Sequence, residues 1–274
     1  MNHRTAPHAP LKIASLTLLL ALVGCAKAGG PAAPKGRVDV DGVFARAHTA
    51  TLGEREPPAH MEVSWVVSAP SAGMSFPAVQ RSEAPGNQLM SAEVPGVGRL
   101  LDGYINGVAF EINPIQGARI KSADETSEAA FDADPRPYLR AAERYPTRRL
   151  AGTADHAGVP CHVVEAVNAR GRSERLYFGV ADGLPRGSDR EVLSAMGPLH
   201  MTAELYDYQE LCPNVLMPTR IIMRTGPMVE ELRATGCALP EAAPPLRLPP
   251  EVEALQSAPP VMGQGHDHDH GHDH

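Results

Sequence analysis

The main pattern along this chain is an alternation of apolar and polar residues with a period of two. It is clearest in Leu199–Tyr206 and is nearly as regular in Met61–Val67. Such alternation is typical of antiparallel strands with one buried face. Beyond a strand that starts at His60, turn residues separate further strand-length runs. These are Met74–Ser82, Gln88–Val94, Gly98–Leu101, Tyr104–Ile112, Arg148–Asp155, Pro160–Val167, Glu174–Val180, Leu184–Asp189, Glu191–Ala195, Leu199–Tyr208, Pro218–Thr225 and Met228–Thr235.

Two segments interrupt this rhythm and predict helices. In Val38–Leu52 the apolar residues recur at helical spacing, and Asp39 or Asp41 is suitably placed to cap the helix. The second segment is Ser122–Tyr145, where Pro135–Tyr145 indicates a helix that starts on proline.

The pattern therefore predicts a mainly β fold with two helical insertions. The sheet would be antiparallel, and a sheet of roughly eleven strands curls because neighbouring strands are twisted relative to one another. With so few aromatic residues, the apolar face of such a sheet must be filled by helices or by a ligand.

The N-terminus has the features of an export signal. Arg4 and Lys12 precede the apolar run Ile13–Val23, which is too short for a membrane-spanning helix of ~20 residues. The run closes on Leu22-Val23-Gly24-Cys25, which resembles the lipobox of bacterial lipoproteins. This resemblance implies cleavage after residue 24 and lipid attachment to Cys25, whose acyl chains would anchor the chain in a membrane. An ordinary secretory signal or an uncleaved anchor is the alternative.

The second residue of the predicted mature chain bears on localisation. This residue is Ala26 rather than an aspartate, which by resemblance to a bacterial sorting rule favours the outer over the inner membrane. The small residues and prolines of 25–36 then form a flexible tether, so the domain would lie in the periplasm or at the surface.

Composition excludes several classes of function. The formal charge of −7 argues against nucleic-acid binding, which selects basic faces. None of the common hydrolase, nucleotide-binding, zinc-protease or redox motifs is present, and His156, His162 and His200 stand alone. Asp132, Asp134, Asp182 and Asp189 lie among turn residues and are expected to support backbone hydrogen bonds. We therefore predict that the protein is not an enzyme.

Three cysteines follow Cys25, so the domain can form at most one internal disulfide. Cys161 reads as a buried residue at the start of a strand. Cys212 and Cys237 could face each other across the last hairpin, but the counted register sets them out of line, so the sequence leaves this pairing open.

The strongest apolar positions on the predicted strands are candidates for a ligand cavity. Aromatic residues make up only 4% of the chain, so such a cavity would be lined mainly by aliphatic side chains. The alternative is that all of them simply pack the sheet against its helices. The candidates are Trp65, Val67, Leu89, Ile105, Phe110, Ile112, Val163, Phe178, Met201, Leu205, Ile221 and Met223.

The order of turn and strand motifs resembles the outer-membrane lipoprotein-sorting family, the LolA/LolB-like group. The resemblance covers residues 37–255 and implies a half-open β-barrel with helices on its concave side, enclosing an apolar cavity for acyl chains. The chain departs from the best-understood members in having its own lipid anchor and a His/Asp-rich tail. The motifs that carry the resemblance are Met90–Gly98, Asp102-Gly103-Tyr104, Asn106–Phe110, Asn113-Pro114, Leu150-Ala151-Gly152, Gly158–Val164, Leu176-Tyr177-Phe178, Met196-Gly197-Pro198, Tyr206-Asp207-Tyr208, Leu216-Met217-Pro218 and Leu248–Val252.

Residues 256–274 are predicted to be a disordered tail with metal-binding capacity. Neutral imidazole and carboxylate suit Zn(II), Ni(II) or Cu(II), and a flexible segment binds them loosely because ordering costs entropy. The residues concerned are His266, His268, His270, His272 and His274.

Taken together, the sequence predicts a lipid-anchored, monomeric cell-envelope protein that binds an acyl chain or a lipoprotein non-covalently. The alternative function is metal binding by the tail, with the barrel as a scaffold. No cofactor is required by the first of these functions.

Overall fold

The computed structural model describes residues 38–194 and 197–257. The predicted signal peptide and tether, Cys25 and the tail histidines 266–274 lie outside the described residues. Within the described part, thirteen strands form one sheet in which every neighbouring pair is antiparallel. The strands are β1 (His60–Ala69), β2 (Met74–Glu83), β3 (Asn87–Val94), β4 (Gly98–Ile105), β5 (Val108–Asn113), β6 (Gly117–Ile120), β7 (Thr147–His156), β8 (Val159–Val167), β9 (Ser173–Gly179), β10 (Pro185–Ser194), β11 (Gly197–Cys212), β12 (Val215–Thr225) and β13 (Met228–Ala238).

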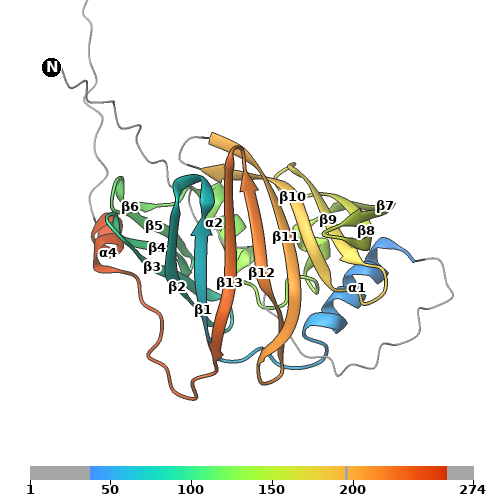
Figure 1. The fold of residues 1–274 in the computed structure, drawn as a ribbon, viewed down its shortest axis with the longest axis horizontal. Helices are drawn as coiled ribbons and strands as arrows, with labels where there is room; N and C mark the ends of the chain where they lie inside the picture. The colour runs from blue at the N-terminus through green and yellow to red at the C-terminus, as the bar shows by residue number, and fades with distance from the viewer. Residues whose placement is uncertain (1–37, 195–196, 258–274) are drawn as a thin grey trace, which may run out of the picture.

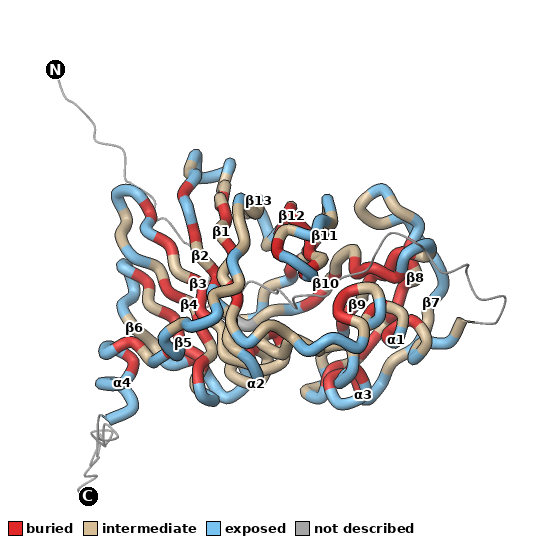
Figure 2. The backbone as a smooth tube through the Cα atoms, turned by 90° about the horizontal axis from the view of Figure 1, so that it is seen from below, coloured by how far each residue is buried: buried red, intermediate tan, exposed pale blue. Residues whose placement is uncertain are grey.

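The sheet is two hairpin meanders joined at its centre. Strands β6 to β1 follow each other on one side, and β13 to β7 follow each other on the other side. The pairing of β1 with β13, with Val67 opposite Leu232, joins the two halves. Because β6 and β7 remain as free edges, the sheet is a curved, open half-barrel, and Figure 2 shows its arch. The predicted fold class is confirmed.

Four helices accompany the described strands, where the sequence predicted two. They are α1 (Val40–Thr51), α2 (Ala123–Asp132), α3 (Ala141–Arg144) and α4 (Pro250–Ser257). Helices α2 and α3 lie under the arch, α1 lies beside β7–β9, and α4 lies beside β6 at the opposite end (Figures 1 and 2).

The first helix follows its prediction, and the second does not. The Asp39 side chain caps α1 by accepting a hydrogen bond from the Gly42 amide at 2.7 Å. In the second segment the helix starts at Ala123, where Ser122 and Glu125 form a reciprocal capping box. The predicted proline start within Pro135–Tyr145 is wrong, because each proline removes a donor and disfavours helical backbone in the residue before it. Only α3 forms there.

Strand boundaries were wrong where turn residues were misjudged. The predicted break near Gly103 is absent, and the chain turns instead at Asn106-Gly107, the other turn signal of this stretch of sequence, where both residues have positive φ. Gly103 allows the Phe110 ring to pack closely against the backbone, since a Cβ at this position would lie only 2.7 Å from the ring. The two runs predicted between residues 184 and 195 are the single strand β10, and β6 was not predicted.

Cys212 and Cys237 form a disulfide with Cα atoms 5.3 Å apart, and Cys161 is a buried free cysteine. The simple hairpin count fails because the two cysteines are not on adjacent paired strands. The pairing of β12 with β13 ends at Arg220–Arg233, while β11 continues beyond a register shift to Cys212 and there contacts β13.

The apolar interior is divided into several clusters. The largest lies under the centre of the arch and contains Trp65, while a second packs α1 against β8 and β9 around Phe44. A third lies under β3–β5 and is covered by the C-terminal segment, from which Val252 of α4 is fully buried. Helix α4 extends to Ser257, two residues past the predicted domain end.

Candidate functional site

A pocket lies on the concave face between the sheet and the segment that connects α2 to β7. The space between them, counted with the part open to solvent, is about 720 Å3. Strands β9 to β12 form its walls, and Pro137, Tyr138, Arg144 and Tyr145 close it from the other side. From the strands come Glu174, Leu176, Phe178, Pro185, Gly187, Ser188, Arg190, Ala203, Leu205, Ile221 and Met223.

Strand register explains why these side chains share one wall. Ser188 pairs with Ala203, and Ala203 pairs with Met223 on the next strand. Leu205 pairs with Ile221 in the neighbouring row. Since directly paired residues project to the same face, these rows form a continuous, mainly apolar surface across three strands.

The structure places four of the predicted cavity residues in this pocket, namely Phe178, Leu205, Ile221 and Met223. Trp65, Val67 and Met201 are buried in the central cluster, and Leu89, Ile105 and Phe110, with Ile112 packed against them, form the cluster under α4. Val163 lies in a separate small cluster with Cys161 and Tyr177. Its neighbour Val164 packs against α1, so Val163 projects from the opposite face.

Aromatic rings form the end of the pocket nearest to α1. The Phe178 ring meets the rings of Phe44 and Tyr138 edge-on, at centroid distances of 5.5 and 5.7 Å. Phe44 also stacks on Tyr145 at 6.1 Å. Burial raises the pKa of both Tyr138 and Tyr145 well above the ordinary phenol value, so both remain neutral at physiological pH.

Buried charged groups lie beside the apolar wall. Asp132, the last residue of α2, accepts hydrogen bonds from Arg144 at 2.9 Å and from Arg190 at 3.5 Å. Glu174 accepts hydrogen bonds from the Tyr145 hydroxyl at 2.8 Å and from the Asn168 side chain at 3.1 Å. One end of the pocket is therefore polar and charged, whereas its walls are apolar.

Sequence reasoning missed this polar end. Asp132 was expected to support a turn, but its carboxylate is buried and paired with two arginines. Asp189 likewise lies in a strand and accepts a hydrogen bond from Tyr177 at 2.7 Å. Asp134 and Asp182 do accept backbone hydrogen bonds, as predicted. Arg190 lies between the two strand runs predicted for this stretch, so no sequence signal pointed to it as an inward-facing strand residue.

A second hollow of about 450 Å3, again counted with its open part, lies at the lower rim of the sheet. It is lined by residues from the loop before β1, the start of β1 and the β2–β3 turn, including Pro57, Met61 and Ala84, with Pro135 and Val215 opposite. None of the other predicted cavity residues lines it. Its lining lacks a buried charged group, so we regard the concave pocket as the better candidate site.

Two further tests concern metals and membranes. Among residues 38–194 and 197–257, no group of three or more histidine, cysteine, aspartate or glutamate side chains is arranged to hold a metal ion. The described helices are also all too short or too polar to cross a membrane.

Comparison with known proteins identifies the fold. No family model and no curated protein matches the sequence. Among solved structures, a LolA superfamily protein from Nitrosomonas europaea matches over 76% of this chain and 96% of its own, with 16% identity and a TM-score of 0.51. A DUF1329 family protein from Desulfovibrio piger matches over 74% and 93%, with 10% identity and a TM-score of 0.49. The match to the Nitrosomonas europaea protein shows that the chain has the LolA-like fold that the order of its motifs predicted.

Proposed function

We propose that this protein binds an acyl chain non-covalently in the pocket under its arch, as a lipid-anchored component of the cell envelope. The observation that carries the proposal is the mainly apolar wall of β9–β12, which borders a pocket that the protein's own helices do not fill. A hydrocarbon chain gains about 0.8 kcal/mol for each CH2 group that it buries, so such a wall favours acyl chains over polar ligands. The ligand could be a free lipid or the acyl chain of a lipoprotein.

The likeness to the LolA superfamily supports this proposal at the level of architecture only, because one fold can serve many functions. The anchor is a separate part of the proposal and rests on the lipobox-like sequence that ends at Cys25. Replacing Cys25→Ser should move the protein from the membrane fraction to the soluble fraction. If the Cys25→Ser protein stays with the membrane, the lipid-anchor part of the proposal is wrong and the part that concerns the pocket is unaffected.

The binding test is native mass spectrometry of the chain from residue 25 onward, carrying Cys25→Ser and exposed to a bacterial lipid extract. We expect adducts with the masses of single acyl lipids. Ala203→Phe should abolish them, because Ala203 is buried in the pocket wall and the larger ring would occupy the cavity.

The matched control is Ala154→Phe, at an exposed position of edge strand β7. It should leave the adducts unchanged, with circular dichroism confirming that both variants fold. Adducts that survive Ala203→Phe, or their absence from the parent chain, would rule out the pocket as an acyl-chain site.

A further inference from the structure

Arg190 is the charged group whose position bears most on which ligand the pocket accepts. It lies on β10 between Glu174 of β9 and Met201 of β11 in the strand register, and its side chain lines the pocket. Only 4% of the side chain is exposed. A guanidinium ion so deeply buried needs hydrogen-bond acceptors, because a buried donor without a partner loses its hydration and gains nothing in return.

The described residues supply few hydrogen-bond acceptors to the Arg190 guanidinium group. Its contact with Asp132 is long, at 3.5 Å, and its Nε has no hydrogen-bond partner within the described residues. The same Asp132 carboxylate is bound more closely by Arg144, at 2.9 Å. Two other carboxylates lie nearby and have partners of their own. Glu174 accepts hydrogen bonds from Tyr145 and from Asn168, and Glu128 is ion-paired with Arg172. Donor capacity therefore remains at the polar end of the pocket.

We propose that Arg190 binds the anionic head of a single-chain amphiphile whose hydrocarbon tail lies along Leu205, Ile221 and Met223. This inference rests on the proposed function and specifies its ligand class, namely an acyl chain that ends in a carboxylate or a phosphate. Guanidinium suits both head groups, since its planar N–H donors match pairs of anionic oxygens and charge-assisted hydrogen bonds are the stronger kind. Ser188, two residues earlier on the same face of β10, adds a hydroxyl to the lining.

The test compares three ligands with the same C16 chain: palmitate, palmitoyl lysophosphatidate and hexadecanol. Dissociation constants are measured by displacement of a fluorescent fatty-acid probe from the chain carrying Cys25→Ser. We expect one or both anionic ligands to bind about ten to a hundred times more tightly than the alcohol, the range expected when a charged hydrogen bond is gained. The anionic ligand that shows the preference identifies the head group.

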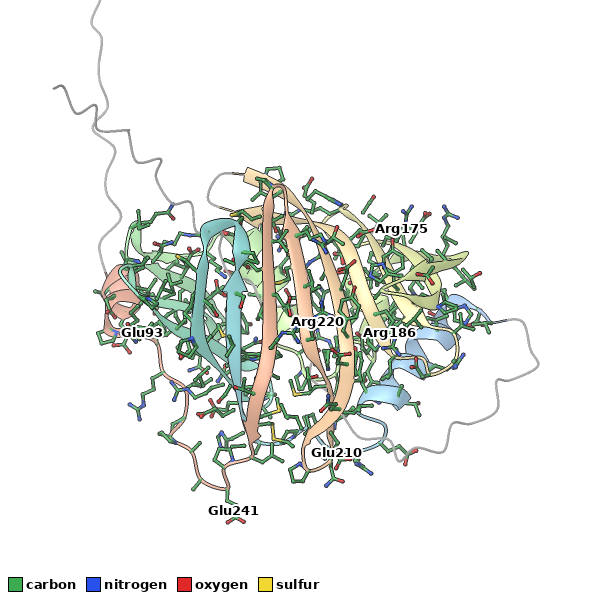
Figure 3. All side chains as sticks on the ribbon, viewed as in Figure 1. Glu93, Arg175, Arg186, Glu210, Arg220 and Glu241 are labelled. Atoms are coloured by element: carbon green, nitrogen blue, oxygen red, sulfur yellow. A yellow bond between two sulfur atoms is a disulfide. The ribbon has the colours of Figure 1, made fainter. Side chains whose placement is uncertain are left out.

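Arg190→Gln should remove the preference by weakening anionic binding while leaving hexadecanol binding nearly unchanged. Arg190→Lys, which keeps the charge, should retain part of the preference and provides a second variant if Arg190→Gln is unstable. The matched control is Arg220→Gln on β12, whose side chain is paired with Glu231 and is next in sequence to the pocket residue Ile221 (Figure 3). It should keep the full preference.

The outcomes separate the two proposals. Equal binding of all three ligands by the parent chain, or an equal loss for all three in Arg190→Gln, would overturn the assignment of Arg190 and leave acyl-chain binding intact. If none of the ligands binds the parent chain, both the proposed function and this inference fall.

Discussion

At the scale of single residues, Glu230 shows how an apolar surface changes the chemistry of one carboxyl group. It lies on β13 directly opposite Met223, so it borders the pocket wall on the concave face. Within the described part of the chain it forms no ion pair or hydrogen bond through its side chain, and burial raises its pKa to about 7. Near neutral pH the folded protein thus has a weakly solvated carboxyl group that readily takes up a proton.

Replacing Glu230→Gln should make stability less dependent on pH. The folded-state pKa is about 7 and the ordinary value is 4.5, so the folded chain binds more protons than the unfolded chain between these values. The free energy of unfolding of the parent therefore falls as pH rises through this window, by up to about 3 kcal/mol above pH 7. We expect Glu230→Gln to be more stable than the parent at pH 8 and similar to it below pH 4.5, as measured by urea unfolding.

The control for this variant is Glu231→Gln, since Glu231 is ion-paired with Arg220 and Arg233. It should not stabilise the protein at pH 8. If the free energy of unfolding of Glu230→Gln depends on pH in the same way as that of the parent, the Glu230 carboxylate is well solvated and the prediction is wrong.

At the scale of elements, local signals predicted the strands better than the helices. Hairpins such as β12–β13 follow from two strand-length runs on either side of Gly226-Pro227, and short-range turn chemistry is enough to place them. The start of α2 depends on the Ser122 capping box, a signal present in the sequence but masked by the prolines that follow. The Cys212–Cys237 bond depends on where strands stop pairing, which the period of the sequence does not reveal.

Removing this disulfide should lower stability by about 3 kcal/mol. The bond closes a loop with a sequence separation of 25 residues, and the loss follows from the greater entropy of the unfolded chain. The variant is Cys212→Ala with Cys237→Ala, compared with the parent by urea unfolding with and without a reductant. We expect the reductant to destabilise the parent and to leave the variant unchanged.

Cys161→Ala is the control for this experiment, because Cys161 is buried but not bonded. That variant should respond to the reductant as the parent does. A parent protein insensitive to full reduction would contradict a stabilising role for the bond.

At the scale of the whole molecule, the pairing of β1 with β13 joins the two meanders at the centre of the sheet, and α2 also links them through contacts with β4, β5 and β10. This pairing sets the arch, and the arch in turn places β9–β12 opposite the α2–β7 connection to form the pocket. The proposed acyl-chain binding at this site would therefore depend on the folded domain. The metal binding expected from the tail would depend on local sequence alone.

The two activities should accordingly be separable. Deleting Gly265–His274 from the chain should abolish Zn(II) binding measured by calorimetry at pH 7.5 and leave palmitate binding unchanged. Zn(II) binding by the intact chain should weaken below about pH 6.5, since protonated imidazole does not coordinate metal. Equal Zn(II) affinity with and without the tail would assign the metal site elsewhere.

The sequence by itself determined the kind of sheet, most of its strands and which of their faces are buried, because strand periodicity and turn chemistry act over a few residues. It also predicted which apolar residues would be buried, including Ile221 and Met223. Only the tertiary structure decided which of these border a hollow and which are packed solid. It alone brought Asp132, Arg144 and Arg190 together, because they lie on separate elements whose approach depends on the curvature of the whole sheet.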